Sequence, residues 1–324
     1  QPLLNIDGIY ARKAAKNQFD AMVLQNSRVK HNIHFQVKNA YYLLDLAQSS
    51  MKVLRKSVDV ATEALRLTKN NEEQGFAKHA DVLEASVRVD ERKNQLLEAE
   101  NQYYAAHDYL IHLLGIGFEE KIETTDTLIH PPAQALINSN TISIENRSDV
   151  LAYQKQIEAS ENMIRSHKMK FVPRINAFGA VEWNDSQFLG TSANNYMVGA
   201  SLSWSIFNGY KNTGAIQHAN AQLDEARINY DDFLSQNQMQ INTALRKMNL
   251  EYNRIESSKL AKEQSQEALR IRTNRYKQGL EKTADLLLSE TLTSQKELEY
   301  IQSIYKYKQS VFEMELLLEQ DINE

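Results

Sequence analysis

Few side chains in this sequence stand where they could do chemistry. His31 and His34 lie three residues apart in a helical pattern, a spacing that two metal ligands on one helix can use. No carboxylate or third histidine is placed to complete such a site, so solvated side chains are the favoured interpretation. The sequence has no cysteine, no glycine-rich phosphate loop and no nucleophile elbow. We therefore expect no catalysis, no cofactor and no bound metal.

Two aspartates are more informative because they occupy equivalent places in a repeated sequence. Residues 74–83 and 278–287 share the pattern Gln-Gly-x-x-Lys-x-Ala-Asp-x-Leu, which contains Asp81 in the first copy and Asp285 in the second. Other matches recur at the same offset of 204 positions, so the chain is a tandem duplication of a half-protein. Several carboxylates around a narrow axis would repel one another and attract cations. The alternative is that an aspartate in the first turn of a helix only compensates the helix dipole.

The composition favours long, uninterrupted elements and narrows the choice of partners. Among 324 residues there are only 10 Gly and 4 Pro, so turns must be few. A mean hydropathy of −0.54, without any apolar run of about 18 residues, predicts no transmembrane helix. A net charge of −5 and an isoelectric point near 6.0 argue against nucleic acid as a partner.

Heptad spacing predicts a long antiparallel helical hairpin in the first copy. From about Ala11 to Asn70 there is no Gly or Pro, and Gly75 marks the turn at the tip. On the returning helix only Arg92 interrupts the apolar pattern. The apolar residues at coiled-coil spacing are Ile33, Val37, Ala40, Leu44, Ala47, Met51, Leu54, Val58, Ala61 and Leu65, then Val82, Ala85, Val89, Leu96, Ala99, Tyr103, Ala106, Leu110 and Leu113.

The second copy predicts a second hairpin from about Gly214 to Glu319. Its tip is at Gly279, and Thr283 is the expected cap of the returning helix. Its apolar seam is looser and is clearest at Ile241, Ala244, Met248, Tyr252 and Ile255. The helices alone would suit a cytosolic coiled-coil scaffold.

Two shorter segments between the helical blocks alternate in polarity, as strands do. Each run has about 11 residues, the length of a tilted strand that crosses a bilayer with its apolar face to lipid and its polar face to a lumen. Trp183, Tyr196 and Trp204 stand where aromatic residues mark membrane interfaces. The alternative is an amphipathic hairpin on a soluble core. The apolar face comprises Ile175, Ala177, Val181 and Trp183 in the first run and Tyr196, Val198, Ala200, Leu202, Trp204 and Ile206 in the second; the other face holds Asn176, Glu182, Met197, Gly199, Ser201, Ser203 and Ser205.

The segment Pro2-Leu3-Leu4-Asn5 reads as the end of the matching strand in the first copy. We therefore expect the rest of that hairpin to precede it and the chain to be a fragment. Two hairpins supply four strands, whereas a closed barrel needs about eight or more. The protein is therefore expected to be an oligomer in the membrane.

Four ordered motifs resemble those of the TolC-like outer-membrane efflux protein family. Residues 147–151 resemble the family's Arg-Pro-Asp-Val helix start, with Ser148 in place of Pro, and residues 171–173 resemble its passage from helix to strand. Residues 202–209 resemble its passage back to helix, usually Leu-x-Trp-Pro-Leu-Phe-Asp-Gly. Residues 275–287 resemble its periplasmic tip. Together with the duplication, these motifs run through the whole chain.

The resemblance implies a mainly α protein with a membrane β-hairpin. Three chains would form a homotrimer with a 12-stranded barrel in the outer membrane of a Gram-negative bacterium, continued by a coiled-coil tunnel through the periplasm. Such proteins are passive exit ducts of tripartite efflux pumps or type I secretion systems. They open at the periplasmic tip on docking to an adaptor and an inner-membrane transporter. Their cargo can be a drug, a metal ion or a protein.

The resemblance also assigns residues to the tip. By motif position Asp285, with Asp81 as its partner, narrows the periplasmic entrance, and Tyr276 latches the closed state. The basic latch residue expected two positions after the tip glycine is Glu281 here, and the adjacent Lys282 could replace it. The residues expected to meet the adaptor are Gln74, Gly75 and Phe76 in the first copy and Gln278, Gly279 and Leu280 in the second.

The expected organisation follows from the duplication and the motifs. An adaptor of the same pumps would carry one helical hairpin flanked by lipoyl-like β segments, which this sequence lacks. The segments are 1–9, the end of the first β-hairpin; 10–115, the first helical hairpin; 116–146, the link between repeats; 147–170, the helix that leads into the strands; 171–208, the outer-membrane β-hairpin; and 209–324, the second helical hairpin.

Overall fold

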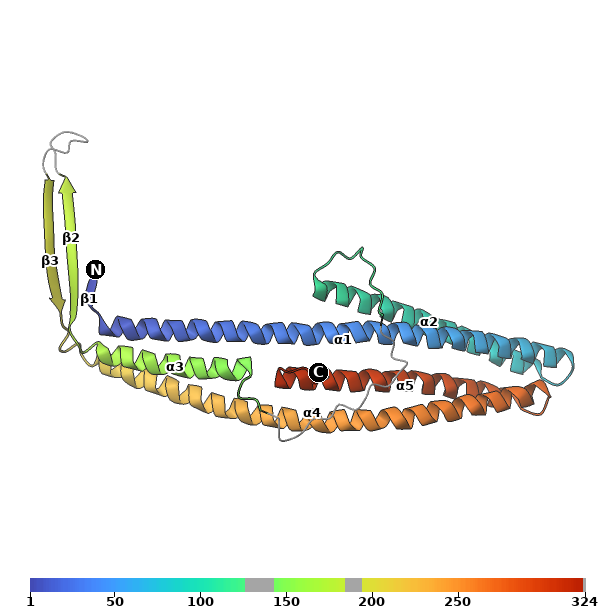
Figure 1. Cartoon of the computed structure of the whole chain (residues 1–324). Coiled ribbons are helices and arrows are strands. Elements are labelled where there is room, and N and C mark those ends of the chain that lie inside the picture. The colour runs from blue at the N-terminus through green and yellow to red at the C-terminus, as the bar shows by residue number, and fades with distance from the viewer. Residues whose placement is uncertain (126–142, 184–193, 323–324) are drawn as a thin grey trace. The chain divides into compact units, whose positions relative to one another are not determined.

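The protein is mainly helical in a computed structural model that describes residues 1–125, 143–183 and 194–322 (Figure 1). Among these residues no helix combines the length and hydrophobicity needed to cross a lipid bilayer. Pro131 and Pro132 of the predicted link lie outside the described residues. The elements are β1 (Pro2–Leu4), α1 (Ile6–Glu73), α2 (His79–Leu114), α3 (Ser148–Met169), β2 (Arg174–Trp183), β3 (Asn194–Ser203), α4 (Lys211–Lys277) and α5 (Thr283–Leu318).

The helix boundaries repeat with the offset seen in the sequence. The starts and the ends of α2 and α5 are both 204 positions apart, and so are the ends of α1 and α4. Helix α1 begins five residues before the predicted Ala11, because the Asn5 side chain accepts a hydrogen bond from the Gly8 N–H (3.1 Å) and caps the helix at that point. It continues to Glu73, three residues past the predicted end at Asn70.

The chain divides into two compact units, and each is described by itself. Unit 1 comprises residues 1–29 and 143–238, and unit 2 comprises residues 30–142 and 239–324. Unit 1 contains the sheet, the start of α1, all of α3 and the first part of α4. Unit 2 contains α2, α5 and the remaining parts of α1 and α4.

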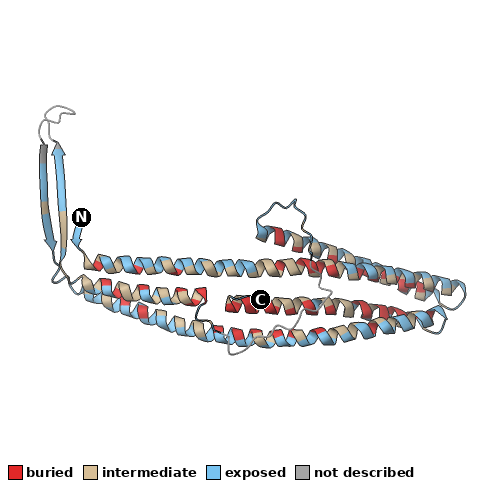
Figure 2. Ribbon diagram, viewed as in Figure 1, coloured by how far each residue is buried: buried red, intermediate tan, exposed pale blue. Residues whose placement is uncertain are grey.

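The sheet of unit 1 has the order β1-β2-β3, with both pairs antiparallel. The β2–β3 register places Ile175 opposite Leu202, Ala177 opposite Ala200 and Val181 opposite Tyr196, which confirms that the predicted apolar residues share one face. That face is uncovered, since Tyr196 and Val198 are more than 80% exposed. Figure 2 shows most of this hairpin as exposed.

Two details of the strands differ from the sequence prediction. Strand β3 ends at Ser203, so Trp204 and Ile206 lie beyond it, and the Trp204 indole N–H donates to the Phe171 carbonyl (2.9 Å). The second face is not wholly small and polar, because the Phe178 ring lies over Gly199; a Cβ there would come within 2.6 Å of the ring. The Trp183 side chain lies outside the described residues.

Charged groups join the elements of unit 1 at both ends of α3. Near the sheet, Arg174 donates both guanidinium bonds to the buried Asp7, and the Ser166 hydroxyl donates to the Asp7 carbonyl (2.9 Å). At the start of α3, the buried Arg147 pairs with Asp149 (2.5 Å), which also pairs with Arg28 of α1 (3.2 Å). The predicted strand at residues 2–5 is confirmed by β1, which pairs with β2 beside Arg174.

The core of unit 2 follows the predicted seams. Seam residues of α1 from Val37 onward are buried or half-buried, whereas Ile33 is 43% exposed. Helix α5 is the most buried element and packs on α4 through Met248, Ile255, Tyr300 and Ile304. The buried residues along α5 are visible in Figure 2.

The residue that interrupts the α2 seam forms a buried ion pair. Arg92 Nη2 lies 3.0 Å from Glu290 Oε2, and the two side chains are 5% and 2% exposed. Arg92 also donates to Thr291 (2.8 Å), and the Ser57 hydroxyl donates to the other Glu290 oxygen (2.5 Å). We call Ser57, Arg92, Glu290 and Thr291 the buried clamp; it joins α1, α2 and α5.

Removing one charge of the buried clamp should destabilise unit 2 strongly. Glu290→Leu leaves the buried Arg92 charge unpaired, which costs about 3–5 kcal/mol, whereas adding Arg92→Leu should recover most of the loss. Thermal unfolding followed by circular dichroism measures both variants. Glu267→Leu is the control, because its pair with Arg270 is solvent-exposed and adds little to stability. Equal losses from Glu290→Leu and Glu267→Leu would contradict the argument.

Candidate functional site

The candidate site is the pair of turns between the long helices of unit 2. We call residues 74–78 the first tip and residues 278–282 the second tip. Gly75 and Gly279 have φ angles of +81° and +72°, which favour glycine. Gly75 N–H donates to the Glu72 carbonyl, and Gly279 N–H donates to the Tyr276 carbonyl. The backbone of the turn therefore repeats with the sequence.

Tyr276 links the two hairpins close to the tips. It is 2% exposed and packs with Ala64 and Ala85 of the first hairpin and with Leu286 and Leu287 of the second. Its hydroxyl lies within hydrogen-bond distance of two others: Thr68 of α1 (2.8 Å) and Thr283 of α5 (3.0 Å). The first bond brings both tips to the same end of unit 2.

The predicted cap at Thr283 is wrong. The N-cap residue of α5 is Lys282, and Thr283 is the first residue inside the helix. Its hydroxyl is directed to Tyr276 instead of to the helix backbone. The hydrogen bond to Tyr276, seven residues earlier across the tip, cannot be predicted from the local pattern that suggested the cap.

The two aspartates occupy equivalent helix positions but differ in their contacts. Asp81 accepts a hydrogen bond from the Lys78 backbone N–H (2.9 Å), so its carboxylate caps its own helix. Asp285 lies in the first turn of α5 and is half-buried. Both carboxylates are therefore placed near the positive end of a helix dipole, as the dipole interpretation predicts.

Glu281 is tied to the helix that precedes it. Its carboxylate accepts hydrogen bonds from Arg272 (2.7 Å) and Arg275 (2.8 Å), and its side chain is only 12% exposed. The Leu280 N–H bond to the Arg275 carbonyl turns the chain back and sets up this contact. The adjacent Lys282 is exposed. At the position where the sequence resemblance predicts a basic latch, this chain thus has an ion pair within its own hairpin.

The outer ends of the tips present apolar side chains to solvent. Phe76 is 74% exposed in the first tip, and Leu280 is 63% exposed in the second. Arg272 and Arg275 make the base of the second tip basic, while Glu281 neutralises part of that charge. Such a surface suits an apolar partner with acidic side chains.

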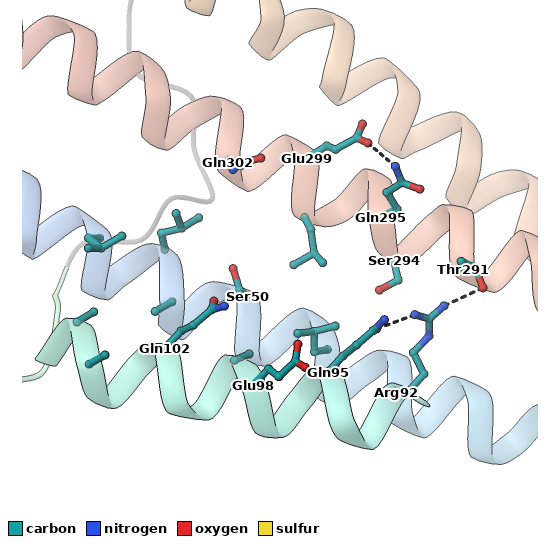
Figure 3. A pocket seen from close by; sticks show the side chains of 18 of the residues that line it. Ser50, Arg92, Gln95, Glu98, Gln102, Thr291, Ser294, Gln295, Glu299 and Gln302 are labelled. Atoms are coloured by element: carbon teal, nitrogen blue, oxygen red, sulfur yellow. Dashed lines mark hydrogen bonds between the residues drawn. The ribbon is translucent and has the colours of Figure 1, made fainter. Parts of the chain in front are cut away.

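The sequence patterns did not identify several residues that the structure places near the tips. Thr68 continues the seam spacing after Leu65, so a polar residue at a seam position was the available signal. Arg272 and Arg275 gave no such signal, because arginine is ordinary on an exposed helix face. A third feature is a cavity of ≈ 870 Å³ between α1, α2 and α5, with Arg92 of the buried clamp at its edge (Figure 3). Polar residues among its lining are Ser50, Gln95, Gln102, Ser294 and Gln302.

The two histidines do not form a metal site with their neighbours. They line a cavity of ≈ 290 Å³ together with Lys38, whose ammonium group bonds to Glu315 (2.8 Å) and Asp321 (3.2 Å). The positive charge beside these two carboxylates is therefore the ammonium group of Lys38. Within the described parts of the chain, no group of three or more potential ligand side chains could hold a metal ion.

Comparison with known proteins agrees with this architecture. The profile of the family described as "Outer membrane efflux protein" matches residues 1–116 and 142–318. The chain belongs to the outer membrane efflux protein family. It is 21% identical over 302 residues to "Toxin and drug export protein A" of Aggregatibacter actinomycetemcomitans, covering 92% of this chain and 66% of that protein. It is 23% identical to "Outer membrane protein OprJ" of Pseudomonas aeruginosa, covering 76% of this chain and 52% of that protein.

Solved structures of outer-membrane proteins share the fold of the chain. The outer-membrane channel OprN matches with a TM-score of 0.86 at 19% identity, over 97% of this chain and 72% of that chain. The outer membrane protein VceC of Vibrio cholerae matches with a TM-score of 0.84 at 18% identity, over 98% of this chain and 76% of that chain. The chain spans about half to two thirds of the length of the curated relatives it matches.

Tyr276→Phe should weaken the link between the hairpins without disturbing the cluster around the ring. The hydroxyl serves Thr68 and Thr283, and each lost hydrogen bond costs about 1 kcal/mol. The melting temperature should fall, and amide hydrogen exchange should speed up at both tips. Tyr104→Phe removes an exposed hydroxyl and is the control. If both variants behave alike, the Tyr276 hydroxyl does not join the hairpins.

Glu281→Ala should loosen the second tip. Arg272 and Arg275 would lose their shared carboxylate and repel each other, so amides of residues 278–282 should exchange faster, and added salt should reduce the difference. The adjacent and exposed Lys282→Ala is the matched control. Unchanged exchange in Glu281→Ala would show that the backbone turn alone holds the second tip.

Proposed function

We propose that the protein is a passive exit duct in the outer membrane, serving a tripartite efflux pump or a type I secretion system. The observation that carries the proposal is the uncovered apolar face of the β2–β3 hairpin on a chain that is otherwise polar and helical. A strand pair with one apolar face and one mostly polar face suits a barrel between lipid and a water-filled lumen. Outer-membrane lipid is then the partner of that apolar face.

We further propose that the duct is a homotrimer with a 12-stranded barrel. In the part of the chain that the structure describes, β3 pairs with β2 on one side only, so its other edge can pair with another copy. The three described strands cannot close a barrel; with the fourth strand expected from the first β-hairpin, three copies would supply twelve. The alternating faces of the hairpin support this assembly.

The tips are proposed as the gate and the docking site. Asp81 and Asp285 would surround the entrance with carboxylates, and Tyr276 would hold the hairpins together in the closed state. The exposed Phe76 and Leu280, with Gln74, Gly75, Gln278 and Gly279 beside them, would meet a periplasmic adaptor that is joined to an inner-membrane transporter. The duct itself would perform no chemistry, and transport energy would come from the transporter.

A coiled-coil scaffold is the second candidate. The two long hairpins and their buried seams would suit a scaffold equally well. The uncovered apolar strands do not suit it, because a soluble scaffold would expose them to water. Solubility of the complete protein without detergent would favour the scaffold.

Single-channel conductance of the complete protein in planar bilayers tests the proposal. We expect a small, cation-selective conductance that widens or loses selectivity in the Asp81→Ala/Asp285→Ala double variant. Asp90→Ala removes an exposed carboxylate of α2 outside the tips and should change nothing. If the protein conducts and the double substitution changes neither conductance nor selectivity, helix capping remains the role of both aspartates. A folded, membrane-extracted trimer without conductance would overturn the duct.

A further inference from the structure

The end of unit 1 that adjoins the sheet is basic, although the chain as a whole has a net charge of −5. Residues 162–181 and 194–223 contain no Asp or Glu. The start of α1 contributes Asp7, and Arg174 already binds that carboxylate. Further basic residues gather where the helices meet the sheet, and we call them the basic collar: Arg12 and Lys13 of α1, Arg165, Lys168 and Lys170 at the end of α3, and Lys211 of α4.

The basic collar has no acidic partner within the described residues of the chain. Lys170 donates to the His167 imidazole (3.1 Å). Burial, together with the charges of Lys170 and His218, lowers the pKa of His167, so the ring accepts this bond in its neutral form. In unit 2, by contrast, Lys247 and Arg272 are ion-paired. The collar charges are therefore available to an anion from outside the chain.

A groove of ≈ 630 Å³ lies within this basic end, where α3 passes into β2 and β3 passes into α4 (Figure 1). We call it the junction groove. Its charged lining residues are Lys170 and Arg174, and no carboxylate of the described residues lines it. Trp204 and Ile206 supply an apolar part and follow the exposed apolar face of β3 in the sequence. Such a lining suits a molecule that is anionic at one end and apolar at the other.

Compensation of helix dipoles explains only some of the collar charges. Lys168 and Lys170 lie at the C-terminal end of α3, where a cation is favourable. Lys211 is the first residue of α4, at the positive end of that helix, and the first turn of α4 contains no acid. Arg12 and Lys13 likewise lie near the start of α1. Cations at the start of a helix are unfavourable unless an anion approaches them.

Asn208 makes the junction groove more favourable to an anion than the usual motif would. The motif that residues 202–209 resemble has Asp at this position, whereas this chain has the neutral Asn. The Asn208 side-chain oxygen accepts a hydrogen bond from the Asn212 N–H (3.4 Å). The amide thus provides the acceptor that a carboxylate would provide at the start of α4, without its negative charge.

Exposed aromatic side chains place the groove at the depth of lipid headgroups in the proposed duct. Trp204, Phe207 and Tyr210 are between 56% and 74% exposed, and the rings of Phe207 and Tyr210 pack edge to face (5.5 Å between centroids). Tyr210 has a φ angle of +64°, which is uncommon for a bulky residue. Aromatic side chains favour the interface between hydrocarbon and water, which is where lipid phosphates lie.

We propose that the junction groove binds the phosphate of an anionic phospholipid in the periplasmic leaflet of the outer membrane. Lys170 and Lys211 would supply the positive charge, and Trp204 and Ile206 would contact the apolar part of the lipid. The apolar lining favours a lipid over free phosphate, which has no apolar part. The inference rests on the proposed function, in which β2 and β3 lie in the membrane, and it adds a preference among lipids.

Native mass spectrometry of the complete protein, stripped of lipid in detergent, measures this binding. Titrations with phosphatidylglycerol and with phosphatidylcholine of the same acyl chains separate charge from apolar contact, and we expect phosphatidylglycerol to bind more tightly. Lys170→Ala/Lys211→Ala should weaken phosphatidylglycerol binding by about fivefold for each lysine and leave phosphatidylcholine binding unchanged. Lys52→Ala/Lys69→Ala is the matched control, because it removes two exposed lysines of α1 in unit 2.

Asn208→Asp provides a second test that leaves the lysines in place. It keeps the acceptor for the Asn212 N–H but adds a negative charge to the groove, so the preference for phosphatidylglycerol should be lost. Asn220→Asp makes the same charge change at an exposed position of α4 and should keep the preference. If both variants keep it, the groove does not bind the headgroup.

The outcomes separate this proposal from the proposed function. Equal binding of the two lipids by the unsubstituted protein would overturn the headgroup site, and so would displacement of phosphatidylglycerol by millimolar inorganic phosphate, which would indicate a site for the free anion. If that protein still conducts in planar bilayers, the duct stands. A complete protein that neither conducts nor requires detergent would overturn both proposals.

Discussion

The packing of α5 against the first hairpin is the constraint on which the rest of unit 2 depends. This helix buries residues along its whole length, and its buried Glu290 is paired with Arg92 of α2 and accepts a hydrogen bond from Ser57 of α1. Such a pair is tolerable only when every charged atom is satisfied. The clamp therefore fixes how the second hairpin packs on the first. Nearer the tips, Tyr276 adds a second link through its hydrogen bonds with Thr68 and Thr283.

The surfaces that the chain leaves uncovered are as informative as its core. The apolar face of β2 and β3 has no protein to cover it within the described residues, and lipid is the proposed cover. Exposed apolar side chains on α2 and α4 in unit 2, such as Leu97 and Leu260, are a different case, because these helices are rich in charged residues. One chain thus exposes apolar side chains in two different surroundings.

The tips show how a duplicated sequence can acquire two roles. The backbone hydrogen bonds of the turns recur at Gly75 and Gly279 because both glycines adopt positive φ angles. The side chains have diverged: Asp81 caps α2, while in the second tip Glu281 is held by two arginines of α4. A carboxylate fastened within its own hairpin has less freedom to bind a neighbouring chain. In the proposed duct, the closed state would then depend more on Tyr276 and the buried clamp than on a basic latch.

Periodic and local features of the fold could be predicted from the sequence alone. The repeat at 204 positions, the seams of α1 and α2, the shared face of the strands and the glycines at the tips all follow from spacing or from one residue's backbone preference. Features that depend on side-chain and backbone partners brought together by folding could not be predicted. The sequence marked Arg92 only as an interruption, Thr283 as a cap and Trp204 as part of a strand. In the structure, Arg92 pairs with Glu290, Thr283 shares a hydrogen bond with Tyr276, and Trp204 donates to the Phe171 carbonyl. A polar group bonds to whichever partner the packing brings within reach.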